Sequence, residues 1–333
     1  MVVTREKCQV CGEIADFQIA DDAVLLREAK CSHCGASLRN SDVAGEIIRY
    51  ISGKNIGLIN QQENLEKYVI LNACSSGYIH EALKQMDHYI CSEFFDGVPT
   101  GEYNDGVLCV DLCDMPFEDN TIDIVITEDV FEHIVGYEKA MKEIYRVLKP
   151  GGCHIFTVPL HDGHKTVSRR NKKSVYHGDP IHADSGCLVI TDWGDDIKSI
   201  VERYGYNVEV IRKHDFYRDD EITVVDDSYD EYLEKKDCLE KYLKYNSTVI
   251  MAYKKLGESS SIKQEIKYSV DELQKRLKDK EQKIIALNRN IRDKKDIIKE
   301  INDDNELRGV HIIELDEQIQ EKNVLIKTLQ KEE

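Results

Sequence analysis

The chain has few prolines, a single tryptophan and no long apolar run. It contains 5 Pro and 19 Gly in 333 residues, and 41% of its residues are apolar. These contents exclude collagen-like and linker-like sequence, and the apolar share is too high for a disordered chain. No run approaches the roughly 18 apolar residues of a membrane span, and the first nine residues contain no apolar signal core. We therefore expect a soluble, cytoplasmic protein.

Basic residues are in the minority. The 63 acidic residues outnumber the 45 basic ones, which gives a formal net charge of −18, and residues 56–258 carry −16 of it. Because such a region repels phosphate backbones, extended nucleic acid is a poor candidate partner.

Cysteine is plentiful, and four of the eleven cysteines form two matched pairs. Cys8-x2-Cys11 and Cys31-x2-Cys34 are each followed by glycine, at Gly12 and Gly35. Two such pairs are typical of a four-thiolate zinc site, whose closed coordination makes the metal structural. We predict a zinc ribbon over residues 1–40. The other seven cysteines are expected to be small core residues.

Residues 41–256 alternate strand-like and helix-like patterns. Helices are expected from the turn after Gly77 to about Met86, over Tyr137–Leu148 until Pro150-Gly-Gly152, and over Asp192–Tyr204. Short apolar runs typical of buried strands occur at 68–71, 88–91, 107–110, 122–126, 154–158, 208–211 and 248–253. This alternation predicts an α/β domain with a mostly parallel sheet, which binds ligands at the carboxyl ends of its strands.

A more specific pattern runs from Asp111 to Gly152. It combines acidic strand ends, the Glu132-His133 pair and the stop at Leu148-Lys-Pro-Gly-Gly152. In this pattern, residues 65–255 resemble class I S-adenosylmethionine-dependent methyltransferases. The resemblance implies a Rossmann-like, seven-stranded methyltransferase sheet. With the cysteine-rich head and Tyr176-His-Gly-Asp-Pro180, the chain resembles a bacterial subgroup that often accompanies glycan-assembly enzymes.

The resemblance also implies a binding site for S-adenosylmethionine. Glu93, at the end of the second strand, would accept hydrogen bonds from the ribose hydroxyls. Asp111, at the end of the third, would contact the adenine amine, with Leu112 packing beside it. Further cofactor contacts are expected after the first and fourth strands, at Ala73, Ser75, Gly77, Thr127 and Glu128. Leu71 stands where the family has an acidic residue, which leaves open a methyltransferase fold that no longer catalyses.

Candidate general bases follow the fourth and fifth strands. An oxygen acceptor usually needs a base near neutral pH, and histidine titrates in that range. We predict catalytic roles for His161, His177 and Asp129; the alternative for each histidine, an ordinary surface residue of its loop, is the commoner case. The same region contains His164, Asp179 and His182, and His133 can orient the loop after the fourth strand.

Basic residues gather in the same loop of this acidic domain. They form either a clamp for an anionic acceptor, such as a phosphorylated or uronic-acid sugar, or a solvated lid. The residues concerned are Lys165, Arg169, Arg170, Lys172 and Lys173. Trp193, the single tryptophan, is expected at a helix start and in a packing role.

The C-terminal residues repeat apolar positions every three to four residues. Six of nine *a* positions are Ile and the apolar *d* positions are mostly Leu, a combination that favours a parallel two-stranded coiled coil. Asn305 at an *a* position would fix the register. We therefore predict a coiled coil over 262–330 and a homodimer.

These features predict methyl transfer from S-adenosylmethionine to a small-molecule or glycan acceptor, with a role in surface-glycan biosynthesis. Two alternatives remain. A zinc-headed ribosomal RNA methyltransferase is disfavoured by the net charge of −16 in the central region. A non-catalytic scaffold would use the fold and the coil to place partners.

Overall fold

The computed structural model describes residues 2–20, 26–161, 163–177, 186–214 and 247–256, together with Lys322. The chain forms two compact units, Met1–Gly257 and Glu258–Glu333, and every described residue except Lys322 lies in the first. The predicted coiled coil therefore lies outside the described residues, apart from Lys322, and stays a prediction. Within the described ranges, no helix combines the length and apolarity needed to cross a membrane.

The head is a small antiparallel sheet of three strands, β1 (Val2–Lys7), β2 (Ile14–Gln18) and β3 (Lys30–Cys31). Helix α1 (Leu38–Tyr50) follows it and was not predicted. Its start is a capping box, in which Ser37 Oγ accepts from Asn40 N at 3.1 Å and Asn40 Oδ1 accepts from Ser37 N at 3.1 Å. The helix thus crosses the boundary predicted between residues 40 and 41.

The central sheet has eight strands, in the order β15-β16-β9-β8-β4-β5-β7-β6. The five from β9 to β7 are parallel, whereas β16 and the edge strands β15 and β6 run antiparallel to their neighbours. All seven predicted strands are present, and β6 is an added edge strand. The strands span β4 (Ile70–Asn72), β5 (Tyr89–Glu93), β6 (Tyr103–Asn104), β7 (Val107–Cys109), β8 (Ile122–Glu128), β9 (Leu148–Thr157), β15 (Tyr206–Arg212) and β16 (Thr248–Lys254).

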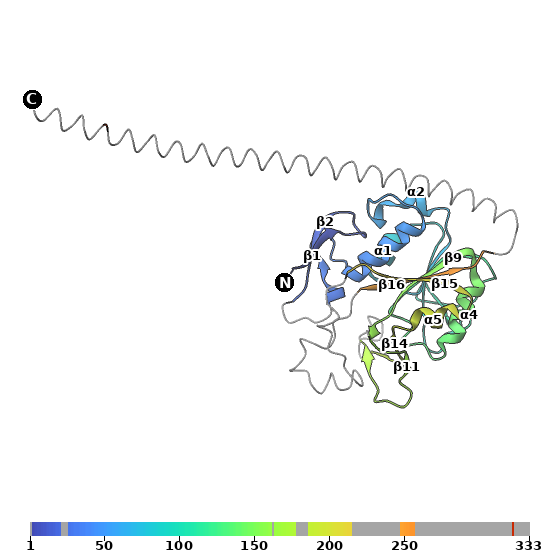
Figure 1. Ribbon diagram of the computed structural model, residues 1–333. Helices are drawn as coiled ribbons and strands as arrows, with labels where there is room; N and C mark the ends of the chain where they lie inside the picture. The colour runs from blue at the N-terminus through green and yellow to red at the C-terminus, as the bar shows by residue number, and fades with distance from the viewer. Residues whose placement is uncertain are drawn as a thin grey trace, which may run out of the picture. The chain divides into compact units, whose positions relative to one another are not determined.

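Helices cover both faces of this sheet (Figure 1). Alternate residues of β8 point to opposite faces, so Ile124 and Ile126 join the core beneath α1 while Val125 joins the core on the other face. Helix α3 (Gly77–Leu83) packs on the side of α1. Helices α4 (Tyr137–Val147) and α5 (Ile197–Glu202) pack on the opposite face. This is a Rossmann-like α/β fold with a mixed sheet.

The head and the central sheet share one hydrophobic core. Cys8, Phe17 and Leu38 of the N-terminal segment belong to the same buried cluster as Ile70 of β4 and Met251 of β16. The stability of the sheet therefore depends on the packing of the head against it.

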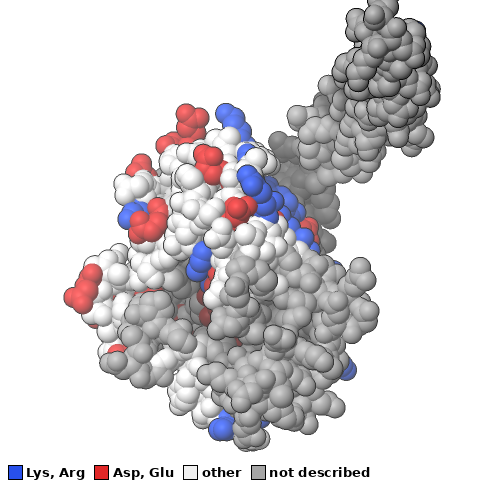
Figure 2. All heavy atoms as spheres, turned by 90° about the vertical axis from the view of Figure 1, so that its left-hand side faces the viewer, with Lys and Arg blue, Asp and Glu red and all other residues white. Residues whose placement is uncertain are grey.

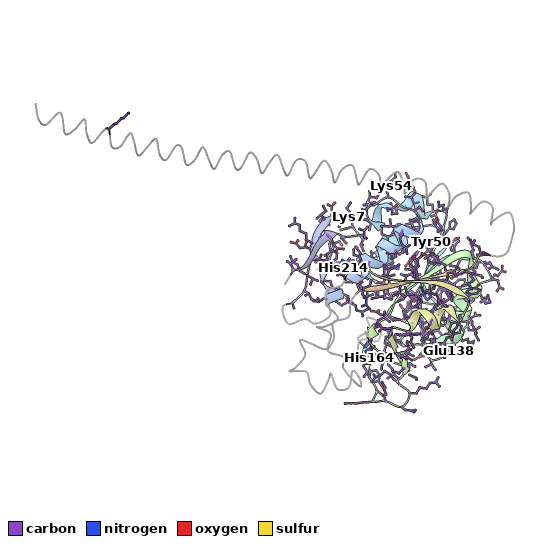
Figure 3. The ribbon with its side chains drawn as sticks, viewed as in Figure 1. Lys7, Tyr50, Lys54, Glu138, His164 and His214 are labelled. Carbon is purple, nitrogen blue, oxygen red and sulfur yellow. The ribbon has the colours of Figure 1, made fainter. Side chains whose placement is uncertain are left out.

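An ionic cluster joins the head to the end of β15. His214, labelled in Figure 3, belongs to this cluster. Its Nε2 lies 2.6 Å from Glu6 Oε2 and its Nδ1 3.3 Å from Asp42 Oδ2. Lys213 Nζ contacts the same two carboxylates, at 2.9 and 3.5 Å. Elsewhere, described basic and acidic side chains are interspersed on the face shown in Figure 2.

One predicted element differs from the structure. The segment expected to be helical from Asp192 begins as strand β14 (Thr191–Gly194), and only α5 is helical. Trp193 therefore lies on a strand, where it is fully buried and packs edge-on against Tyr137 with ring centroids 4.7 Å apart. Its packing role is confirmed and its place at a helix start was wrong, because tertiary pairing of β14 outweighed the local helical pattern.

Several short strands follow β9 in the sequence. β10 (Leu160–His161) and β11 (Val167–Ser168) both pair with β14, and β12 (Tyr176–His177) forms an antiparallel pair with β13 (Cys187–Leu188). These pairs bring histidines of the loop after β9 back towards the ends of β8 and β9.

Candidate functional site

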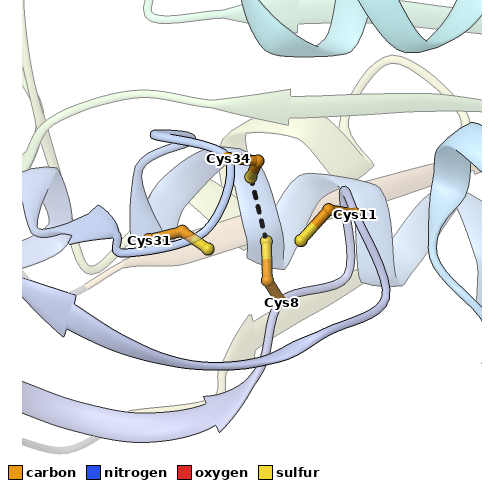
Figure 4. A group of neighbouring side chains, drawn as sticks. All are labelled: Cys8, Cys11, Cys31 and Cys34. Atoms are coloured by element: carbon orange, nitrogen blue, oxygen red, sulfur yellow. Dashed lines mark hydrogen bonds between the residues drawn. The ribbon is translucent and has the colours of Figure 1, made fainter.

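The four paired cysteines converge in the head (Figure 4). Their sulfurs all lie within 4.8 Å of one another, and Cys8 Sγ is 3.7 Å from Cys34 Sγ. A tetrahedral zinc ion with Zn–S bonds of about 2.3 Å holds its sulfurs about 3.8 Å apart. The geometry of Cys8, Cys11, Cys31 and Cys34 therefore fits the zinc ion that the sequence predicts.

Both cysteine pairs have the same backbone turn. Gly12 N donates to Cys8 O at 2.7 Å and Gly35 N donates to Cys31 O at 2.9 Å, and both glycines have positive φ, at 87° and 82°. Burial acts to raise the pKa of Cys31, but the backbone amides of Cys34 and His33 outweigh it and lower this pKa. At Cys8 burial outweighs the backbone amides and raises the pKa to about 11, and burial likewise raises the pKa of Cys34. Such turns suit thiolate ligands because they direct amide dipoles at sulfur.

The predicted cofactor residues lie along the carboxyl edge of the sheet. Glu93, at the end of β5, accepts hydrogen bonds on Oε2 from both the backbone N and the Oγ of Ser75, each at 3.2 Å. This joins the end of β5 to the turn that precedes α3, where Gly77 begins the helix. The carboxylate of Asp111 accepts from Cys113 N at 2.8 Å. Leu112 is buried in the core that contains α4, and Ala73 packs against the same core.

β4 lacks the acidic residue that the methyltransferase family has at the position of Leu71, and the neighbouring side chains do not replace it. Leu71 is fully buried in the core that contains α4. Asn72 points to the other face, where its Nδ2 donates to Tyr89 Oη at 3.0 Å. Tyr89 Oη also lies 3.0 Å from His80 Nδ1. Asn72 thus bonds within the layer of α3, and Leu71 cannot supply the missing carboxylate.

The head closes over the residues that end β8. Arg39 Nη1 and Asn40 Nδ2 donate to Glu128 Oε2 at 3.0 and 2.7 Å. Arg27 donates to both carboxylate oxygens of Asp129, at 3.2 and 2.8 Å. Thr127 is buried and lies with Oγ1 2.9 Å from His154 Nε2. Each of the predicted site residues Thr127, Glu128 and Asp129 therefore contacts another protein side chain.

Burial and the neighbouring arginines shift the pKa values of Glu128 and Asp129 in opposite directions. Burial acts to raise the pKa of Asp129, but Arg27 and Arg39 outweigh it and hold this pKa well below its usual range. Burial raises the pKa of Glu128 against the opposing effect of Arg39. An arginine-paired Asp129 is a weak base, so its position does not favour the predicted catalytic role.

Arg27, Arg39 and Asn40 are site residues that sequence reasoning missed. They precede the methyltransferase-like region in the sequence, and their contacts with β8 span about ninety to one hundred residues, 102 for Arg27 and Asp129. The Ser37-x-x-Asn40 capping signal was available, but nothing local in the sequence links the arginines to Glu128 and Asp129.

The structure brings two predicted catalytic histidines to one small cavity. Its lining includes Glu132, His161, His177 and Asp192. His161 Nε2 lies 3.9 Å from Asp192 Oδ1, and burial lowers the pKa of His161 to about 4. At neutral pH this imidazole is uncharged and a weak base. Asp179 and His182 lie outside the described residues.

The basic loop is partly committed to internal ion pairs. Arg169 is buried, and its Nη1 lies 2.9 and 3.2 Å from the two carboxylate oxygens of Asp192. Lys172 Nζ lies 3.4 Å from the same carboxylate. Lys165, Arg170 and Lys173 are basic residues with exposed side chains, and Lys172 is exposed as well. Arg169 thus supports the cavity wall, and the exposed cations are left for any contact with an acceptor.

Part of the central sheet belongs to a sequence segment that matches a known protein family. Residues 72–156 match the family model described as a methyltransferase domain. The chain is 27% identical over 121 residues to uncharacterized protein MJ0638 of *Methanocaldococcus jannaschii*, covering 36% of this chain and 53% of that protein. It is 32% identical over 103 residues to the ubiquinone/menaquinone biosynthesis C-methyltransferase UbiE of *Haemophilus ducreyi*, covering 30% of this chain and 34% of UbiE.

The matches thus span less than two thirds of either relative. Among solved structures, a complex of the *Haloferax volcanii* Trm112 methyltransferase activator with a methyltransferase includes a chain 19% identical to this one, with a TM-score of 0.34. That match covers 60% of this chain and 87% of the other. By sequence, the segment from β4 to β9 matches methyltransferase domains, and it contains every residue expected to contact the cofactor.

Proposed function

We propose that this protein transfers a methyl group from S-adenosylmethionine to a small-molecule or glycan acceptor. The observation that carries the proposal is the methyltransferase-domain match over residues 72–156. Within that match, Glu93 and Ser75 are hydrogen-bonded at the carboxyl edge of a mostly parallel sheet. This edge is where such sheets bind nucleotide-like ligands.

The residues present suit the groups of the cofactor. The carboxylate of Glu93 can accept hydrogen bonds from two ribose hydroxyls, and the Ser75 bonds hold it at the strand end. Asp111 follows β7, two strands from β4, and would contact the adenine amine. The turn from Ala73 to Gly77 would take the amino-acid tail, and bound S-adenosylmethionine supplies the methyl group.

The acceptor would enter beside the cavity of His161 and His177. Burial makes His161 a weak base, and Asp192, 3.9 Å from its Nε2, would stabilise the imidazolium that forms when His161 takes a proton from the acceptor. Lys165, Arg170 and Lys173 would favour an anionic sugar. We further propose a role in surface-glycan biosynthesis in the cytoplasm, because the chain resembles a bacterial subgroup that often accompanies glycan-assembly enzymes.

Two structural roles complete the proposal. Zinc on the four cysteines would hold the head in the form that presents Arg27 and Arg39 to β8, because both arginines lie between or beside the ligand pairs in the sequence. The C-terminal heptads over 262–330 would form a parallel coiled coil and make the protein a homodimer.

One observation favours a non-catalytic scaffold as the second candidate. Leu71 is buried in the core, and Asn72 is bonded to Tyr89, so this strand end lacks the acidic residue that the family uses there. A scaffold would retain the fold without turnover.

Calorimetry with the purified full-length chain tests both candidates. We expect saturable binding of S-adenosylmethionine. We also expect transfer of a labelled methyl group to one member of a panel of neutral sugars, uronic acids and phosphorylated sugars. Ribosomal RNA serves as the competing acceptor in the same assay. Binding without transfer to any fraction of a cell extract would favour the scaffold, and absence of binding would contradict the proposed enzyme.

A further inference from the structure

The side chain of Glu132 is a buried carboxylate. Its side chain is only 2% exposed, and neither carboxylate oxygen has a hydrogen-bond partner in the described part of the chain. Its backbone is firmly placed, since Glu132 O accepts from Ile190 N at 2.7 Å and from Thr191 N at 3.1 Å. An unpaired buried carboxylate is costly, and cations commonly offset that cost.

Two histidine nitrogens face this carboxylate. His133 Nε2 lies 3.6 Å and His177 Nδ1 lies 3.7 Å from Glu132 Oε1. The ligand atoms of all three residues lie within 4.8 Å of one another. The two rings meet edge-on with centroids 5.3 Å apart, so their nitrogens converge from different directions.

The tautomer of His133 is set by its second nitrogen. His133 Nδ1 lies 2.9 Å from the carbonyl oxygen of Leu188, which can only accept, so Nδ1 carries a proton. In the neutral ring, Nε2 then presents a lone pair towards Glu132. A lone pair and a carboxylate oxygen repel each other unless a cation lies between them. Metal-binding histidines commonly donate their other N–H to a backbone carbonyl in this way.

We propose that Glu132, His133 and His177 bind a divalent transition-metal ion, distinct from the zinc of the cysteine cluster. Two imidazoles and one carboxylate are a ligand set used for catalytic zinc and for non-haem iron. Ligand atoms about 2.1 Å from a tetrahedral ion lie about 3.4 Å apart, close to the observed 3.6 and 3.7 Å. Three protein ligands leave at least one coordination position open.

The open position would face the cavity that His161 and Asp192 also line. An oxygen-containing ligand could complete the coordination there, next to the place proposed for the acceptor. That role rests on the proposed function, whereas metal binding itself does not.

Cobalt(II) is a suitable probe because its spectrum distinguishes the two sites. The full-length protein is freed of metal with a chelator and titrated with Co²⁺ alone, without S-adenosylmethionine. We expect two ions per chain, one with the sulfur-to-cobalt charge-transfer bands of a cysteine site and one with visible d–d bands only. Glu132→Gln and His177→Ala should each weaken the second ion by at least about tenfold and leave the sulfur bands intact.

Matched variants keep the test decisive. His88→Ala removes an exposed histidine elsewhere and should retain both ions, whereas Cys31→Ser should lose the sulfur bands alone. His177 lies on a half-exposed hairpin, so its variant is expected to fold even if Glu132→Gln does not, and circular dichroism checks this. A wild-type protein with sulfur bands only, or unchanged second-site binding in His177→Ala, would overturn the site. Calorimetry on the metal-free protein measures S-adenosylmethionine binding separately.

Discussion

Arg27 and Asp129 are joined by two hydrogen bonds, Nη1 to Oδ1 at 3.2 Å and Nη2 to Oδ2 at 2.8 Å, across 102 residues of sequence. The arginine comes from the head, and the aspartate directly follows β8 and adopts a positive φ of 52°. Thr157 Oγ1 also donates to Asp129, at 3.0 Å. This pairing fixes the head on the carboxyl edge of the sheet.

Replacing this arginine should destabilise the first unit. Arg27→Ala removes two charge-assisted bonds from a mostly buried carboxylate, and Arg39 at 3.4 Å compensates in part, so we expect the free energy of unfolding to fall by about 2–3 kcal/mol. Urea unfolding measures this. Arg5→Ala is the control, because its side chain is 73% exposed and the change should stay within about 0.5 kcal/mol. Equal effects of the two variants would show that the Arg27 pair contributes nothing.

Loss of zinc should affect more than the head. Cys31→Ser is expected to release the metal and, because Cys31 belongs to the core that includes β4 and β16, to lower the melting temperature of the whole first unit. Metal analysis and thermal unfolding check both effects. Cys91→Ser, outside the cluster, should retain the metal. If the wild-type protein contains no stoichiometric zinc, the head has another role.

The cofactor site can be tested at Glu93. Glu93→Ala should weaken binding of S-adenosylmethionine by about 2–4 kcal/mol, since each charge-assisted bond contributes about 1.5–3 kcal/mol and water compensates in part. Calorimetry measures the affinity, and the exposed Glu102→Ala serves as control. An affinity unchanged by Glu93→Ala would remove this residue from the cofactor site.

The His214 cluster predicts a pH dependence of stability. Burial acts to lower the pKa of His214, but bonds to Asp42 and Glu6 raise it from its usual 6.5 to about 9. The stability that this group contributes is therefore complete below about pH 6.5 and lost as the pH rises through about 9. Burial acts to raise the pKa of Glu6, but His214 and Lys213 lower it from 4.5 to about 2, so its contribution is lost only as the pH falls through about 2.

Unfolding measured between pH 6 and 10 checks the alkaline limb. His214→Gln should be less stable than the wild type near pH 6 and should lose less stability between pH 7 and 10. Parallel pH profiles for the two proteins would show that His214 does not titrate as proposed. His88→Gln, at an exposed position, should follow the wild-type profile.

The tail predicts the oligomeric state. Light scattering should find a dimer for the full-length chain and a monomer for residues 1–258, which should still bind S-adenosylmethionine. Asn305→Ile should raise the melting temperature of the coil and loosen its choice of oligomer, because the buried amide exchanges stability for register. A full-length monomer or trimer would contradict the two-stranded assignment.

The seven principal strands and the paired cysteines of the head were predictable from local patterns in the amino-acid sequence. Strands such as β8 are apolar on both faces, and Cys-x2-Cys spacing is a local signal, so each is readable without knowledge of the fold. Tertiary structure alone decided that Asp192 and Trp193 lie on a strand, because β14 is held by β10 and β11 rather than by local propensity.

Long-range contacts were likewise beyond the sequence. The Glu132-His133 pair was visible, but only the hairpin of β12 and β13 brings His177 to it, and only the packing of the head brings Arg27 to Asp129. Whether two side chains far apart in the chain meet depends on the path of the backbone between them. The local pattern of apolar and polar residues does not determine that path.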